Sequence, residues 1–114
     1  MDETAQFVSD LNVARFVDRL QLENEPTRRA VLQKLLIEEE DKLGRNAERL
    51  SNLQRHIAEG NRRIALQKTL IERLRANSYD IGLAERTLNN LFEIQKIFEH
   101  HRQVVLDAMD RDRS

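Results

Sequence analysis

The chain has 114 residues, of which 34% are charged and 4% are aromatic, with one proline, three glycines and no cysteine. This composition is typical of long helices, and it excludes a disulfide framework and thiol chemistry. The N-terminus lacks the basic and apolar regions of a secretory signal, and no stretch reaches the roughly 18 apolar residues that a membrane span needs. We therefore expect a cytoplasmic, all-α protein with no membrane contact.

Charge is unevenly distributed along the chain, although the net charge is only −1. Residues 1–25 hold six acidic side chains and two arginines, whereas residues 55–75 hold six basic and two acidic side chains. A basic segment of this size usually faces solvent or balances acidic groups of the same protein. It is also the segment on which a nucleic-acid-binding function would depend.

The first predicted helix covers residues 10–23. Ser9 or Asp10 can cap it, and an apolar stripe follows at helical spacing, formed by Val13, Phe16, Val17 and Leu20. Pro26 is the only proline. It suits the first turn of the next helix, because the N–H that proline lacks would have no partner there.

A long second helix is predicted over residues 26–76. Apolar residues recur every seven positions along it, which is typical of a coiled-coil-like helix that keeps one seam against a partner; they are Leu36, Leu43, Leu50, Ile57, Ile64 and Ile71. The row three residues further on contains polar residues, so the pattern is not a strict zipper. A helix stop at Gly44 and a new start at Asn46 is the alternative. The seven-residue row passes this point without a change of phase, which favours the continuous helix.

Residues 77–82 are rich in turn formers, and Asp80 can cap the last predicted helix, residues 81–109. A short connection makes this helix antiparallel to the long one, as in a helical hairpin. We expect the first helix to pack on the first half of the long helix and the last helix on its second half. The acidic residues 1–25 and the basic residues 55–75 would then lie far apart in one subunit.

The seam along the long helix is the expected hydrophobic core. Its predicted members are Leu36, Leu43, Leu50, Ile57, Gly60, Ile64, Ile71, Leu91 and Phe98. Glycine inside a helix costs about 1 kcal/mol relative to alanine, so Gly60 needs a structural reason. We expect it to let a large side chain, such as Phe92 or Phe98, pack onto bare backbone. A kink in the helix and the close approach of a ligand are the alternatives.

The segment from His56 to Ile64 resembles an H-I-A-E-G-x-R-R-I segment found in small, all-helical α-proteobacterial proteins, and it is also similar to helices beside sensor modules. Residues 26–30 and 35–40 resemble the same group. A Gly-His-Asp turn often follows in that group, and residues 77–80 keep only its aspartate. The resemblance implies a bacterial, cytosolic, helical protein and brings no activity with it.

The histidines do not predict a metal or catalytic site. His100 and His101 point about 100° apart on a helix, so they cannot hold one ion from one face. His56 and Glu59 have the spacing of two ligands, but no second such pair accompanies them. The carboxylates at 38–41 are expected to form a solvated face. No nucleophile–base set and no phosphate loop is evident, so the sequence predicts a non-enzymatic protein without cofactor or metal.

A second apolar face predicts self-association into a dimeric four-helix bundle. Leu66 and Leu70 lie away from the seven-residue row, and the last helix carries a matching surplus of apolar residues. The predicted homodimer interface contains Leu66, Leu70, Ile94, Ile97, His101 and Val104. His101 is expected to be a buried, neutral histidine within this interface. The alternative is a monomer in which the first helix covers one of these rows.

The predicted function is therefore a helical protein–protein interaction module that acts as a homodimer. The resemblance to helices beside sensor modules suggests a cytosolic bacterial regulatory or signalling adaptor, with a sensor kinase or a response regulator as its partner. The alternative is a nucleic-acid-binding protein that uses the basic residues 55–75, with Tyr79 stacking on a base.

Overall fold

The computed structural model describes residues 3–42 and 45–113, which form four helices. They are α1 (Glu3–Leu22), α2 (Pro26–Asp41), α3 (Asn46–Ala76) and α4 (Gly82–Arg113), and these two ranges contain no β-strand. The predicted all-α class is confirmed. None of the described helices is both long enough and apolar enough to cross a membrane.

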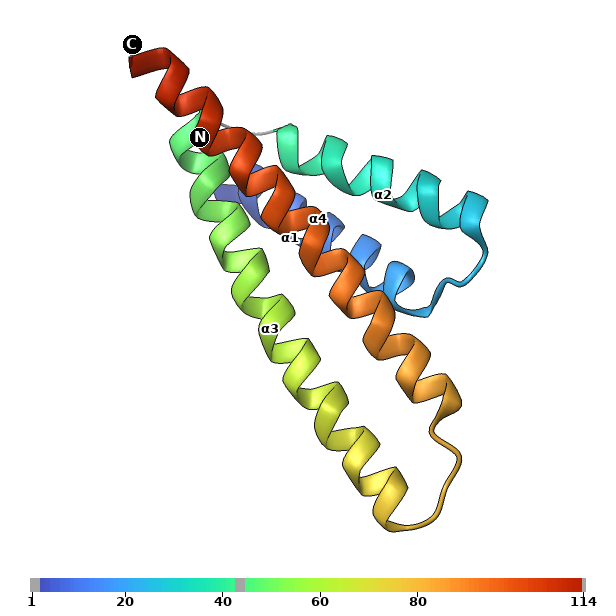
Figure 1. Cartoon of the computed structure of the whole chain (residues 1–114). Helices are drawn as coiled ribbons and strands as arrows, with labels where there is room; N and C mark the ends of the chain where they lie inside the picture. Colours follow the sequence, from blue (N-terminus) through green and yellow to red (C-terminus); the bar gives the residue numbers. More distant parts are fainter. Residues whose placement is uncertain (1–2, 43–44, 114) are drawn as a thin grey trace.

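Helices α3 and α4 run antiparallel and define the long axis of a molecule that measures 56 × 27 × 24 Å (Figure 1). Helices α1 and α2 form a shorter pair that packs against one half of the α3/α4 hairpin. The other half, residues 65–89, follows these core contacts, projects beyond the α1/α2 pair and is termed the distal half. The contacts nearest to it join Arg63 and Asn90 to Gln21 of α1.

The hydrophobic core lies where the two helical pairs meet, and every helix contributes to it. Its buried members are Val13, Val17, Leu20, Leu36, Leu53, Ile64, Leu91, Ile94, Phe98 and Val105. Within α1 and α4 they recur mostly at spacings of three and four residues, so each helix turns one apolar stripe inward. Tertiary packing of such stripes, rather than intrinsic propensity, stabilises most helices in proteins.

The predicted seam residues divide between the core and its edge. Among them, the buried residues are Leu36, Ile64, Ile71, Leu91 and Phe98. Leu50, Ile57 and Gly60 are half-buried, and Leu43 lies outside the described residues. A straight helix drifts by about 20° per seven residues relative to such a row, so the row leaves the buried face towards the start of α3. Leu53, which belongs to the row three residues further on, is completely buried there instead.

The continuous helix predicted over residues 26–76 is wrong, because α2 ends at Asp41 and α3 begins at Asn46. The alternative, a break near Gly44, is the arrangement present, although Gly44 itself lies outside the described residues. The unbroken phase of the seven-residue row was misleading. Helix α2 packs mainly on α1, whereas α3 packs on α4. The apolar row of each helix is therefore covered by a different partner helix. The change of direction between them brings α1 against α4 and part of α2 against α3 (Figure 1).

The start of α2 follows directly from its sequence. The carboxylate of Glu25 accepts hydrogen bonds from the backbone N–H groups of Thr27 and Arg28, at 3.1 and 2.8 Å. These two hydrogen bonds lower the pKa of Glu25, and the bond from Arg28 has the larger effect. Pro26 occupies the first turn, where it removes no helical hydrogen bond. Helix α1, by contrast, begins at Glu3, well before the predicted start at residue 10.

A turn with a left-handed residue ends α3. The N–H of Tyr79 donates to the carbonyl of Leu74 at 2.9 Å, and the N–H of Ser78 donates to that of Arg75 at 3.1 Å. This is a Schellman motif, and it holds Ser78 at a φ of 61°, a conformation that favours glycine. Asp80 then accepts a hydrogen bond from the backbone that opens α4. The turn sets the antiparallel course of α3 and α4.

Candidate functional site

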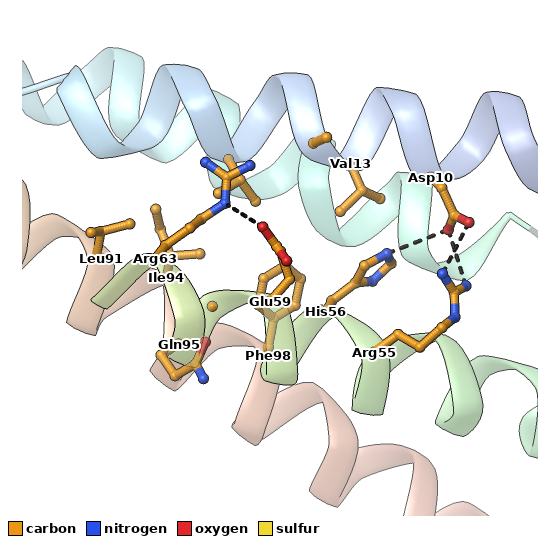
Figure 2. A pocket seen from close by; sticks show the side chains of 13 residues that line it. Asp10, Val13, Arg55, His56, Glu59, Arg63, Leu91, Ile94, Gln95 and Phe98 are labelled. Carbon is orange, nitrogen blue, oxygen red and sulfur yellow. Dashed lines mark hydrogen bonds and ion pairs between the residues drawn. The ribbon is translucent and has the colours of Figure 1, made fainter. Parts of the chain in front are cut away.

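A cavity of about 350 Å³ lies between α1, α3 and α4 (Figure 2). Its apolar wall consists of Val13, Val17, Leu91, Ile94 and Phe98. Because these residues also belong to the core, the cavity is an incompletely filled part of the interface between α1 and the α3/α4 hairpin. Charged side chains surround its opening.

Two ion pairs connect α1 to α3 across this opening. Arg55 donates to both oxygens of Asp10, at 3.1 and 3.2 Å. Arg63 donates to Asp18 at 2.7 Å. The prediction that the acidic N-terminal and the basic 55–75 segments lie far apart is therefore wrong. The reason is the break between α2 and α3. It reverses the course of the chain, so that α3 passes close to α1.

The environment of Asp10 favours its charged form. Burial by itself would raise the pKa of Asp10. The hydrogen bond and the positive charge of Arg55, a hydrogen bond from Gln6 and the nearby His56 together outweigh that effect, and the pKa of Asp10 lies below its ordinary value. Asp10 is thus a carboxylate held ionised by its partners at the edge of the cavity.

His56 sits in the wall of the cavity between three helices. Its Nε2 is 3.4 Å from Asp10 on α1, its Nδ1 contacts Glu40 on α2, and its ring lies 5.6 Å from that of Phe98 on α4. The two carboxylates face opposite nitrogens, so they cannot share a metal ion with the ring. Glu59 pairs with Arg62 instead. No group of metal-binding side chains occurs among the described residues.

The carboxylates at 38–41 do not form the solvated face that the sequence suggested. Glu40 is only 4% exposed, and Glu39 is buried as well. Asn12 donates to Glu39 at 2.8 Å, and Lys42 lies 3.0 Å from its other oxygen. The expectation failed because α2 is a short helix whose last turn faces both α1 and α3, so two of its four acids point inward.

Gln95 fills the space beside Gly60. Its Nε2 donates to the carbonyl of Ile57 at 2.7 Å and to Asn61 at 2.8 Å. A Cβ at position 60 would lie 1.9 Å from Oε1 of Gln95. A large side chain does pack onto bare backbone here, but the prediction that Phe92 or Phe98 would do so is wrong. Phe98 packs against His56 instead.

The residues predicted for the dimer interface fall into three groups by burial. Ile94 and His101 are buried inside the single chain, where α1 and α2 cover this side of α4. His101 contacts Asp41 of α2, with Nε2 2.9 Å from the carboxylate. Ile97 is half-buried. The remaining residues, which stay exposed, are Leu66, Leu70 and Val104.

Sequence reasoning missed the contacts that join the two helical pairs, although one signal was available. Asp10 and Asp18 are eight residues apart, and so are their partners Arg55 and Arg63. Equal spacing places each set on one side of its helix. The two carboxylates of α1 can therefore meet the two arginines of α3 together.

Comparison with known proteins adds no family: no family model matches the chain, and no curated protein or solved structure matches it significantly. The class of protein is therefore defined by its fold, an all-α protein built from two helical pairs.

Proposed function

We propose that the protein is a non-enzymatic, helical protein–protein interaction module that acts as a homodimer. The observation that carries this proposal is the uncovered apolar surface of the distal half. Leu66, Leu70 and Leu83 are 57%, 44% and 67% exposed there. Clusters of large apolar residues on a protein surface usually mark a contact with another chain.

These leucines lie on the same face of α3 and α4 as residues that α1 covers in the other half of the hairpin. Leu66 and Leu70 follow Arg63 by three and seven residues, and Arg63 contacts α1. Leu83 precedes Asn90 by seven residues, and Asn90 also contacts α1. A helix turns by about 100° per residue, so these spacings place each leucine on roughly the same side of its helix as the residue that contacts α1. The packing surface thus extends past the end of α1, where none of the four described helices covers it.

A second copy of the chain is the occupant that fits this surface best. Two distal halves related by a two-fold axis supply two antiparallel helices each, which is the composition of a four-helix bundle. Ile97 lies at the middle of α4 and Val104 in its C-terminal half, where they line a separate groove with Ile37. The proposed dimer therefore does not require them.

The paired state of the polar side chains supports a non-enzymatic role. His56 and His101 each contact carboxylates of other helices, so both rings take part in contacts between helices of the fold. The wider role proposed is a cytosolic bacterial regulatory or signalling adaptor, with a sensor kinase or a response regulator as partner. Its support is the resemblance of residues 56–64 to helices beside sensor modules, which is an associational argument.

The geometry gives less support to nucleic-acid binding. Of the basic residues in 55–75, Arg55 and Arg63 pair with acids of α1 and Arg62 pairs with Glu59. These charges are balanced within the protein, so half of the basic segment is not available to phosphates.

The homodimer is tested by sedimentation of the parent protein and of the variants Leu66→Glu and Leu70→Glu. We expect the parent to sediment as a dimer at micromolar concentration and both variants as helical monomers, because a buried charge without a partner opposes association. Phe7→Glu is the matched control, since Phe7 is 68% exposed but lies near the opposite end of α1 from the distal half. A monomeric parent, or variants that stay dimeric, would refute the dimer. A pull-down that recovers kinase or response-regulator chains would support the adaptor role, whereas co-purified nucleic acid would contradict it.

A further inference from the structure

The outer side of the α1/α2 pair presents large apolar side chains that none of the four described helices covers. The inner side of the pair packs on the α3/α4 hairpin and buries Leu20 and Leu36 there (Figure 1). Leu22 follows Leu20 by two residues and Val31 precedes Leu36 by five, so at about 100° per residue both lie on the opposite sides of their helices. Leu22, Val31 and Leu35 are 64%, 53% and 38% exposed.

These three residues line one groove between α1 and α2, with a volume of about 570 Å³, and Leu32 lies in the same lining. The two helices run antiparallel across a short connection, and Asn12 of α1 is hydrogen-bonded to Glu39 of α2 at 2.8 Å. An apolar groove between two packed helices accepts the apolar face of a third helix, whose side chains enter it at spacings of three and four residues. The shape of the groove therefore fits an amphipathic helix.

The charged residues of α1 are divided between its two sides. Asp10 and Asp18 pair with arginines of α3 on the inner side. Arg15 and Arg19 are one helical turn apart, and neither has a hydrogen bond or an ion pair among the residues that the structure describes. Arg19 lines the groove beside Leu22. The carboxylates of α1 are thus occupied within the protein, whereas these two guanidinium groups are not.

The remaining charges of the groove do not compensate Arg15 and Arg19. Glu23 and Arg28, which also line it, pair with each other at 2.5 Å. Glu38 is exposed and has no such partner in the described part of the chain, but it lies on α2, so the side of the groove that α1 forms stays basic. A second copy of the chain would bring the same arginines, whose like charges oppose association. An acidic partner complements them.

We propose that this groove binds an amphipathic helix of a partner protein, with the apolar face of that helix against Leu22, Val31 and Leu35 and its carboxylates beside Arg15 and Arg19. Apolar contact supplies affinity in such complexes, and the charges fix the orientation of the bound helix. The inference rests on the proposed role as an interaction module. It does not rest on the homodimer, because the groove contains no residue of the distal half.

The probe is a synthetic helix of about 18 residues, or roughly five turns, with leucines along one face, glutamates along one flank and glutamines elsewhere. In the matched peptide, lysine replaces every glutamate. Calorimetry measures the affinity of each peptide for the whole protein, and NMR follows the methyl signals of Leu22, Val31 and Leu35. We expect the glutamate peptide to bind and to shift these signals, and the lysine peptide to bind more weakly because it places like charges beside the arginines.

Val31→Glu should abolish binding of the glutamate peptide while circular dichroism shows unchanged helix content, because it places a charge in the apolar floor at an exposed position. Leu66→Glu should retain binding, which separates this groove from the dimer surface. Arg19→Glu should weaken the glutamate peptide by about fivefold, the upper range for one exposed ion pair, and strengthen the lysine peptide. Arg86→Glu, the same change at an exposed position of the distal half, should alter neither affinity.

Absence of glutamate-peptide binding to the parent, or undiminished binding to Val31→Glu, would overturn the proposal. Equal binding of the two peptides, unaffected by Arg19→Glu, would overturn the assignment of an acidic partner. A parent dimer that Val31→Glu converts to a monomer, and that Leu66→Glu leaves intact, would assign the groove to a second copy of the chain instead.

Discussion

Gly60 and Gln95 share one space, because the amide of Gln95 lies where a side chain at position 60 would be. A Cβ on Gly60 would approach the Oε1 and Cδ atoms of Gln95 to 1.9 and 2.8 Å. We predict that Gly60→Ala destabilises the protein, although alanine favours the helix by about 1 kcal/mol. To make room, Gln95 must give up its bonds to Ile57 and Asn61, which costs about 1–3 kcal/mol for a buried amide. Urea denaturation measures the difference.

The same substitution in a Gln95→Ala background is the control. With the amide removed, nothing opposes the helix preference of alanine, so Gly60→Ala should then stabilise the protein by about 1 kcal/mol. A Gly60→Ala variant that stabilises both backgrounds equally would show that the two residues do not compete for this space.

The pH dependence of stability should contain a contribution from Asp10. Its pKa in the folded protein lies below the ordinary value of 3.8, so the unfolded chain takes up the proton more readily. The ionised group therefore stabilises the fold above about pH 4, and this contribution is lost as the pH falls through the folded pKa. Asp10→Asn should lower the stability at pH 7 by roughly 0.2–1 kcal/mol, the range for a partly exposed ion pair.

The measurement is the free energy of unfolding between about pH 7 and pH 2, with Asp107→Asn as the control. Asp107 is exposed and accepts a hydrogen bond from Gln103 of its own helix. The stability of Asp10→Asn should fall less steeply with acid than that of the parent. A parallel fall in both proteins would contradict this role of Asp10.

Local features of the fold could be predicted from the sequence, because each depends on neighbouring residues. Pro26 marks the start of α2, the turn formers at 77–80 separate α3 from α4, and helical spacing identifies the inward position of Phe98. Spacing shows which side of a helix is buried, but it does not show which helix buries it. The seven-residue row therefore remained in phase across a break that it could not reveal.

The candidate site depended on that break and could not be predicted. Ala14 lines a cavity with residues of α3 and α4 only because the chain folds back after α2, and the burial of Glu40 follows from the same fold-back. Contacts between residues so far apart in the chain are fixed by the direction in which the chain turns after Asp41. The equal spacing of the acids in α1 and the arginines in α3 was the available sign.

Ser78→Gly should stabilise the protein. Ser78 has a φ of 61° in the motif that ends α3, and a left-handed conformation costs a residue with a Cβ about 1–2 kcal/mol. Glycine avoids most of this cost but gains freedom in the unfolded chain, so the expected net gain is roughly 0.5–1 kcal/mol. Thermal denaturation should show a higher midpoint. Ser51→Gly, in the exposed interior of α3, is the control and should lower the midpoint.

Glu40 and His56 form a buried pair, and we predict that removing His56 costs more stability than removing Glu40. The side chain of Glu40 is only 2% exposed, and His56 is its only partner among the described residues, whereas His56 also faces Asp10. His56→Leu should therefore cost about 3–5 kcal/mol, because it leaves a buried carboxylate without a partner. Glu40→Leu should cost less, roughly 1–3 kcal/mol, because His56 keeps its second contact.

The double variant Glu40→Leu/His56→Leu should be more stable than His56→Leu alone, since replacing both members of a buried polar pair by apolar groups of similar shape is often nearly neutral or stabilising. Urea denaturation at pH 7 gives the free energies of all four proteins in the cycle. Glu38→Leu, at an exposed position of the same helix, should change stability by less than about 0.5 kcal/mol. Single effects that simply add in the double variant would show that Glu40 and His56 are not energetically coupled.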